Sequence, residues 1–240
     1  MNLLYAAAER MRKMLPDTIK LILFDMAGTT VDDRCAGSSF VVSAFIKSFN
    51  KHGFEVSLET VNKYRGMQKR QAIHDIISSI DQDRSSGEII DGIYKELLSE
   101  LKVHIPKMKE IEGTSEIFHF LQSRMIKVGV GSGFPREIID MIVSQLGWKA
   151  KGLVDYIQSA DSIGASRPDP KMIYHMMNEF GICNPHEVVK VGDTVVDILE
   201  GKNAGVWTVA VLTGSQSKEQ LESVGPDYML NSVKDLPTLF

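Results

Sequence analysis

The chain has 240 residues, of which 43% are hydrophobic and 24% charged, with a formal net charge of −4. This ordinary globular composition excludes a collagen-like, coiled-coil or mainly disordered chain, and the length suits one or two domains. The lack of a basic stripe argues against nucleic-acid binding, and no apolar run approaches the roughly 20 residues that span a bilayer. Charged residues interrupt the N-terminal segment, which argues against a secretory signal. Two cysteines, Cys35 and Cys183, fit a cytoplasmic protein.

The first elements place a carboxylate at the end of a buried strand. Residues 1–16 have the apolar spacing of a short amphipathic helix, which Pro16 ends. The near-continuous apolar run 19–24 predicts a strand that is buried on both faces of a parallel sheet. Asp25 and a glycine turn follow directly, at the edge where open α/β sheets place their chemistry.

A helical insertion then separates this strand from the rest of the chain. Strand signals are missing from about residue 38 to residue 101, where apolar spacing predicts helices over 40–49, from Ser57, along 72–77 and over 89–101. Beyond it, helix and strand patterns alternate. The predicted strands are 126–131, 156–159, 188–192 and 207–211, and the predicted helices are 114–123, 135–146, 171–180 and 198–204. We therefore expect an α/β fold with helices on both faces of a parallel sheet. Its core comprises 1–34 and 105–240, and its helical cap 35–104.

Polar residues stand at the carboxyl ends of the predicted strands. They are Asp25, Ser132, Arg167, and Asp193 with Asp197. These ends share one edge of a parallel sheet, so the side chains can converge. Neighbouring carboxylates indicate a Mg²⁺ site, since this ion prefers oxygen ligands. A guanidinium and a hydroxyl suit phosphate oxygens, and an exposed aspartate suits nucleophilic attack on phosphorus.

Four segments resemble the four motifs of the haloacid dehalogenase superfamily, in the same order. They are Asp25–Thr30, Gly131–Gly133, Arg167–Pro168 and Gly192–Asp197. The resemblance covers about residues 18–215, and the helical insertion falls where that superfamily inserts its cap. It implies a Rossmann-like core, Asp25 as the nucleophile that forms an aspartyl phosphate, and a Mg²⁺ site made of Asp25, the Ala27 carbonyl, Asp193 and Asp197. The implied phosphate-binding residues are Thr29, Ser132, Gly133 and Arg167.

Within the superfamily the chain is most similar to the phosphonoacetaldehyde hydrolases, or phosphonatases. Most phosphatases of the superfamily have a second aspartate where this chain has Ala27, and phosphonatases also have alanine there. The resemblance implies that Lys69 forms a Schiff base with the substrate aldehyde, so that the imine accepts the electrons of the C–P bond. It also puts Cys35 near the pocket. The chain departs from the phosphonatase pattern at Arg65 and Ala72, where that family has methionine and histidine.

The Schiff base needs a neutral amine, and we expect burial under a closed cap, beside a cation such as Arg65 or Arg70, to lower the pKa of Lys69. A non-covalent substrate contact and an exposed surface lysine are the alternatives for Lys69. Ser132 also suits a helix cap, and Asp197 a charge at a helix N-terminus.

The sequence predicts a Mg²⁺-dependent hydrolase acting on a small phosphonate of the phosphonoacetaldehyde type. One alternative is a phosphatase of small phosphate esters, of the phosphoglycolate type. Another is a phosphate-binding or regulatory protein that has lost catalytic activity, in which Ala27 has replaced the second aspartate. Dehalogenase activity is disfavoured, because dehalogenases of this superfamily need no Mg²⁺. The resemblance also implies a homodimer.

Overall fold

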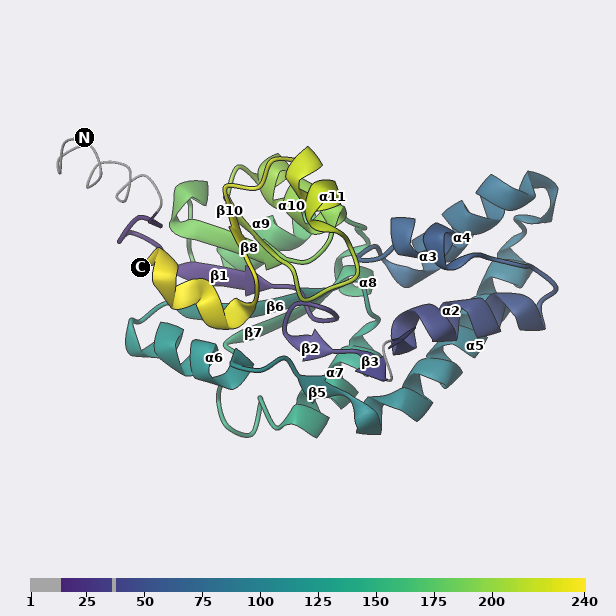
Figure 1. Ribbon diagram of the computed structural model, residues 1–240, viewed down its shortest axis with the longest axis horizontal. Helices are drawn as coiled ribbons and strands as arrows, with labels where there is room; N and C mark the ends of the chain where they lie inside the picture. The colour runs from purple at the N-terminus through teal and green to yellow at the C-terminus, as the bar shows by residue number, and fades with distance from the viewer. Residues whose placement is uncertain (1–13, 36–37) are drawn as a thin grey trace.

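A six-stranded parallel sheet forms the centre of the larger part of the protein (Figure 1). The computed structural model describes residues 14–35 and 38–240, so most of the helix predicted over 1–16 lies outside it. In sheet order the strands are β10 (Tyr228–Leu230), β9 (Trp207–Val211), β8 (Val188–Gly192), β1 (Leu21–Phe24), β6 (Lys127–Ser132) and β7 (Tyr156–Ser159). Five of the six strands were predicted. The sixth, β10, has only three half-buried residues and leaves no periodic pattern.

Helices cover both faces of this sheet. They are α6 (Thr114–Ser123), α7 (Arg136–Leu146), α8 (Ala160–Ile163), α9 (Lys171–Glu179), α10 (Val195–Ala204) and α11 (Lys218–Ser223). Successive side chains of β1 point to opposite faces of the sheet. Ile22 and Phe24 belong to the apolar cluster that contains α6 and α7, whereas Leu21 and Leu23 pack with the methionines of α9. This two-sided burial explains the unbroken apolar run, and the α/β prediction is confirmed.

Four helices, here called the cap, form a separate layer beside the sheet (Figure 1). They are α2 (Phe40–Lys51), α3 (Leu58–Lys63), α4 (Lys69–Ile80) and α5 (Gly87–His104). Ser39, Ser57 and Ser86 cap three of them, because each hydroxyl accepts a backbone N–H of the first turn. The helical insertion is thus present as predicted. Its boundaries at 35 and 104, and the homodimer, stay predictions. None of the helices within residues 14–35 and 38–240 is long and apolar enough to cross a membrane.

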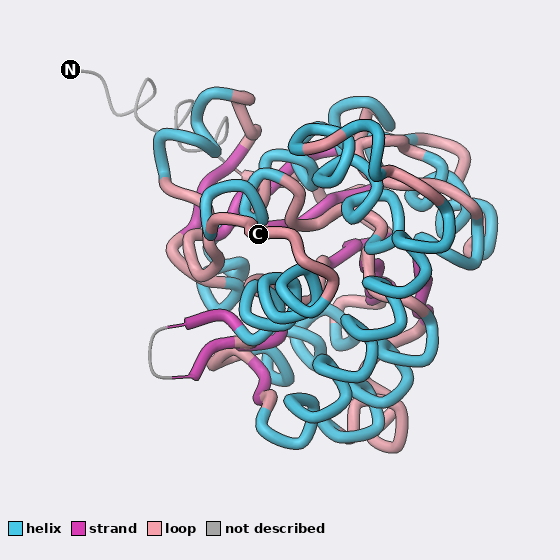
Figure 2. Tube along the Cα trace, turned by 90° about the vertical axis from the view of Figure 1, so that its right-hand side faces the viewer, coloured by secondary structure: helices cyan, strands magenta, loops and turns pink. Residues whose placement is uncertain are grey.

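Short strands flank the passages between core and cap. β2 (Val31–Asp32) pairs antiparallel with β5 (Lys109–Glu110), and β3 (Arg34–Cys35) pairs antiparallel with β4 (Ser38–Ser39). Figure 2 shows the molecule from the cap end, with β3 and β4 at its edge. Two-residue strands are too short for a sequence pattern, so they were not predicted. Short 3₁₀ helices cover 82–84, 105–107, 185–187 and 233–239.

Candidate active site

Three carboxylates meet at the carboxyl edge of the sheet. Asp25 follows β1, Asp193 follows β8, and Asp197 lies in the first turn of α10. One oxygen from each lies within 4.8 Å of the others, because β1 and β8 are parallel neighbours. The turn after β1 packs tightly here, since a Cβ added to Gly28 (φ +98°) would lie 2.4 Å from Oδ2 of Asp193. The convergence that the sequence predicted for these three residues is present.

Asp193 and Asp197 differ in how their oxygens are satisfied. Asp197 forms a capping box with Thr194, and its Oδ1 lies 3.0 Å from both Lys190 Nζ and Arg167 Nη1. Burial opposes its ionisation, but Lys190 and Arg167 outweigh burial and hold the pKa of Asp197 below its usual value. Oδ1 of Asp193 accepts a 2.8 Å hydrogen bond from Thr29. Its Oδ2 is buried with no hydrogen-bond partner among the residues that the structure describes.

This arrangement fits a metal ion. Burial, together with the nearby Asp25, raises the pKa of Asp193 to about 8. A cation beside the unpartnered Oδ2 would remove that cost and favour the ionised form. Asp25 and Asp193 therefore have oxygens suited to a hard cation, whereas Asp197 is held by the protein's own cations.

Arg167 lies beneath the carboxylates with its side chain fully buried. Its Nη1 donates to Oδ1 of Asp25, and its Nη2 donates to the Gly131 carbonyl at 2.6 Å. Its Nε lies 2.9 Å from Oε2 of Glu200, which also lies 3.0 Å from Lys190 Nζ. The sequence analysis missed Lys190 and Glu200. A lysine in the otherwise apolar strand β8 was the available signal, because a buried charge needs a partner.

The predicted phosphate-binding turn follows β6 and lies directly under the cap. Ser132 does not cap α7, because its Oγ accepts the backbone N–H of Phe134 at 3.2 Å and α7 begins later, at Arg136. A Cβ added to Gly133 would lie 2.1 Å from the backbone oxygen of Met67 in the cap. Only glycine allows so close an approach between core and cap here.

Lys69, the first residue of α4, points into the same region. Its side chain is buried, with Nζ 3.1 Å from the Met67 carbonyl and 4.8 Å from the centroid of the Phe134 ring. Burial, opposed by Asp25 and assisted by Arg65, lowers the pKa of Lys69 to about 8. Lys69 is therefore not an exposed surface lysine.

Of the two basic neighbours proposed to act on Lys69, Arg65 is buried with it. Arg70 instead lies half exposed and pairs with Asp91 at 2.8 Å. Two further predicted residues, Thr29 and Cys35, remain. Thr29 faces Asp193, and its phosphate contact stays a prediction. The side chain of Cys35 lies outside the described parts.

Core and cap enclose a cavity of about 20 Å³, roughly the space of one water molecule. Its lining residues come from both layers, and they are Asp25, Ala27, Val41, Phe45, Arg65, Gly66, Lys69, Ser132, Gly133 and Phe134. Hydrogen bonds hold the layers together, since Oδ1 and Oδ2 of Asp161 in α8 accept from Gln68 (2.5 Å) and Tyr94 (3.1 Å) of the cap. The cap is closed, so Asp25 and Lys69 line one small cavity.

Comparisons with known proteins agree with this geometry. The family model for haloacid dehalogenase-like hydrolases matches residues 22–211. The chain belongs to this family. It is 33% identical over 223 residues to a phosphonoacetaldehyde hydrolase of Bacillus cereus, covering 86% of this chain and 82% of the relative. A Bacillus anthracis phosphonoacetaldehyde hydrolase is 31% identical, with 87% and 83% covered.

Solved structures share the fold. A phosphonoacetaldehyde hydrolase-like protein from Oleispira antarctica superposes with a TM-score of 0.80 at 25% identity, covering 92% of this chain and 91% of that one. A hydrolase from Pseudomonas syringae, 16% identical, superposes with a TM-score of 0.78 over 91% of this chain and 96% of its own. The protein is thus an enzyme of the haloacid dehalogenase-like family, and its relatives make it a phosphonatase-like member.

Proposed function

We propose that this enzyme is a Mg²⁺-dependent hydrolase that cleaves the C–P bond of a small phosphonate aldehyde of the phosphonoacetaldehyde type. One observation carries the proposal: a buried amine with a pKa of about 8, Lys69, lines the same small cavity as the nucleophile Asp25. An ordinary lysine has less than a thousandth of its amine neutral at pH 7, so this shift raises the reactive fraction by more than 100-fold. The similarity to phosphonoacetaldehyde hydrolases supports the same chemistry.

In the first half-reaction, the neutral amine of Lys69 adds to the aldehyde carbon, and loss of water leaves an imine. Protonation of the imine nitrogen makes it an electron acceptor. Asp25 then forms an O–P bond as the C–P bond breaks, and the C–P electron pair passes into the iminium to give an enamine. The products of this step are an aspartyl phosphate on Asp25 and an enamine on Lys69.

In the second half-reaction, the enamine carbon takes up a proton, and water releases the aldehyde product and the free amine of Lys69. A second water cleaves the aspartyl phosphate and releases inorganic phosphate. No alkoxide leaves at any stage, so an acid at position 27 is not needed. The methyl side chain of Ala27 fits this requirement.

The remaining residues of the site stabilise the phosphoryl group. Asp25, the Ala27 carbonyl and Asp193 would hold Mg²⁺, which neutralises negative charge on the phosphoryl oxygens when it is bound. Asp197 keeps Arg167 and Lys190 in place behind them. Ser132, together with the backbone N–H groups near Gly133 and Thr29, would bind the phosphoryl oxygens. The donors of Arg167 go to Asp25, Gly131 and Glu200, so its phosphate contact stays a prediction.

A trapping experiment tests the proposal. Borohydride added with phosphonoacetaldehyde and Mg²⁺ reduces the imine to a stable amine, and peptide mass spectrometry locates it. We expect the adduct on Lys69, with loss of activity. Lys69→Arg keeps a cation but cannot form an imine, so C–P cleavage falls by several orders of magnitude. Lys63→Arg, at an exposed lysine of α3, is the matched control and keeps full activity.

Other outcomes select the alternatives. If borohydride traps nothing, and Lys69→Arg changes only KM toward a phosphate ester, the enzyme is a phosphatase and Lys69 is a substrate contact. If no phosphate is released from phosphonoacetaldehyde or from phosphate esters, the protein is a phosphate-binding or regulatory member of the family.

A further inference from the structure

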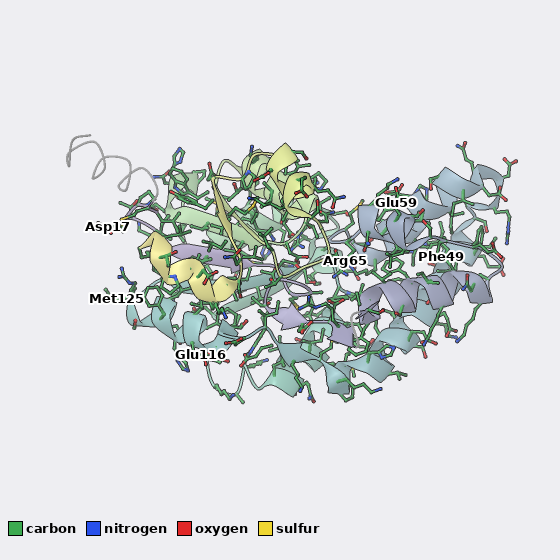
Figure 3. All side chains as sticks on the ribbon, in the orientation of Figure 1. Asp17, Phe49, Glu59, Arg65, Glu116 and Met125 are labelled. Atoms are coloured by element: carbon green, nitrogen blue, oxygen red, sulfur yellow. The ribbon has the colours of Figure 1, made fainter. Side chains whose placement is uncertain are left out.

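Arg65 is a buried cation that joins the cap to the core. Its Nη1 donates to Oγ of Ser39 at 2.9 Å. Its Nη2 lies 3.4 Å from both Oδ2 of Asp33 and the backbone oxygen of Ala27. Only 5% of the residue is exposed, and Figure 3 shows it between the cap helices and the core. One side chain therefore contacts the linker into the cap and the turn that follows β1.

The acceptors of Arg65 form a small network of their own. Oδ2 of Asp33 also accepts a hydrogen bond from Ser39, and Asp33 is itself buried. The hydroxyl of Ser39 in turn accepts the N–H of Val42 and starts helix α2. Arg65 is thus tied to the start of the cap as well as to the active-site turn. Burying an arginine and an aspartate is costly unless they are paired, so this pair holds one geometry.

The segment that leads from Arg65 to Lys69 lies against the core at two further points. Arg167 Nη1 donates to the Gly66 carbonyl at 3.4 Å, and the N–H of Gln68 donates to Ser166 Oγ at 3.1 Å. Helix α4 begins immediately afterwards, with Lys69 as its first residue. The position of the Lys69 amine therefore depends on how this segment is held, and Arg65 is its first fixed point.

We propose that Arg65 is a positioning residue for Lys69: its three contacts fix the segment 65–69 on the core and hold the amine in the cavity that Asp25 lines. It acts through Lys69 and does not itself react. The proposal rests on the proposed function only in that Lys69 is the working group. The charged groups near Lys69 are Asp25 after β1, Asp161 of α8, Arg167 of the core and Arg65 itself.

The test removes the contacts of Arg65 without leaving Asp33 as a buried, unpaired charge. Arg65→Met combined with Asp33→Asn removes both members of the pair. Arg70→Met, one residue after Lys69 and at an exposed ion pair, is the matched control. The first readout is the pH dependence of Lys69 acylation by acetic anhydride in the metal-loaded enzyme without substrate, followed by peptide mass spectrometry. It measures the amine directly and needs no turnover.

We expect a labelling midpoint near pH 8 in the native enzyme and in Arg70→Met. In the double variant the midpoint rises by about one pH unit, because a cation close to the amine is gone. kcat for phosphate release falls on the order of 100-fold, the usual effect of displacing a reacting group by about 1 Å. Inhibition by inorganic phosphate is unchanged, since Ser132 and Gly133, which would bind the phosphoryl oxygens, lie in the core.

A double variant that folds with native thermal stability, and keeps both the native labelling midpoint and the native kcat, would overturn the proposal and leave Arg65 with a structural role only. If the double variant does not fold, Arg65→Lys gives the same decision. It keeps the charge but lacks the forked donors, so kcat must fall while inhibition by phosphate holds. A fall in kcat in an enzyme that borohydride cannot trap would support the positioning role and reject the C–P chemistry, so the two failures are distinguishable.

Discussion

Arg167 donates a hydrogen bond from Nη1 to Oδ1 of Asp25, the carboxylate that directly follows strand β1. The two residues are 142 positions apart in the chain, and both are buried. Oδ1 of Asp197 lies 3.0 Å from the same Nη1, and Oε2 of Glu200 lies 2.9 Å from Nε of the same guanidinium. The direction of the Asp25 carboxylate is thus set by a network of charged side chains that extends behind the sheet edge.

Asp25→Asn should abolish turnover while the fold is kept. The amide oxygen can still accept from Arg167, but an amide does not attack phosphorus. We expect kcat to fall by roughly three orders of magnitude or more in a phosphate-release assay. Circular dichroism should show an unchanged melting temperature. Asp17→Asn, at an exposed aspartate, serves as the control, and substantial activity in Asp25→Asn would contradict the aspartyl-phosphate mechanism.

Metal removal should make stability depend on pH in a definite direction. The pKa of Asp193 is raised to about 8 in the folded protein, from 3.8 for a free side chain. The folded state then binds a proton that the unfolded state has lost, so in EDTA the free energy of unfolding falls as pH rises from about 4 to about 8. Mg²⁺ should therefore raise the melting temperature more at pH 8 than at pH 6. Asp193→Asn should lose this difference, and an equal Mg²⁺ effect in native and variant protein would argue against the site.

Ala27→Asp should change which bond the enzyme prefers to cleave. A carboxylic acid at this position can protonate an alkoxide leaving group, and general acid catalysis contributes about 10²- to 10⁴-fold. We expect hydrolysis of alkyl phosphate esters to rise relative to C–P cleavage, as measured by phosphate release from both substrates. Ala27→Asn, which has a similar size but no acid, separates proton donation from crowding. An unchanged ratio would mean that leaving-group protonation does not distinguish the two reactions here.

Gly133→Ala should prevent cap closure without unfolding the core. The added methyl would lie 2.1 Å from the backbone oxygen of Met67 and 2.6 Å from that of Gly66. Backbone atoms cannot move aside without shifting the whole segment. We expect at least a tenfold loss of kcat/KM, with the melting temperature little changed. Gly87→Ala in the cap has no atom within 4 Å of its new methyl and should behave as the native enzyme. Native activity in Gly133→Ala would show that this contact is not part of the working state.

The pH–rate profile should report the Lys69 amine. The reactive form is neutral and the pKa of Lys69 is about 8, so kcat/KM for phosphonoacetaldehyde should rise with pH to a midpoint near that value. The rate of borohydride inactivation in the presence of substrate should follow the same curve. For a phosphate ester, which forms no imine, kcat/KM should not rise with pH in this way. If both substrates gave the same pH profile, the titrating group would lie in the core and would not be Lys69.

The sequence by itself determined the parallel sheet, the helical insertion and the carboxylates that meet at one edge. A short, nearly continuous apolar run such as 19–24 is typical of a strand that is buried on both faces. The carboxyl ends of parallel strands lie along the same edge of the sheet. Asp25, Asp193 and Asp197 could therefore be placed together from their positions after or near strand ends. Short elements such as β10 were not predicted, because three residues are too few to show the alternation of apolar and polar side chains that marks a strand.

Only the tertiary structure decided which partners each polar group has. The lysine in the apolar strand β8 signals that a partner is needed, but only the structure shows that Lys190 and Glu200 complete the ion-pair network of Arg167 across the sheet and α10. Arg65 and Arg70 are both near Lys69 in the chain, but Arg65 is buried beside it, whereas Arg70 is half exposed and pairs with Asp91. The reason is physical: the energy of a charge depends on its distance to other charges and on its exposure to water. Both quantities follow from how the cap packs on the core, and no local pattern encodes them.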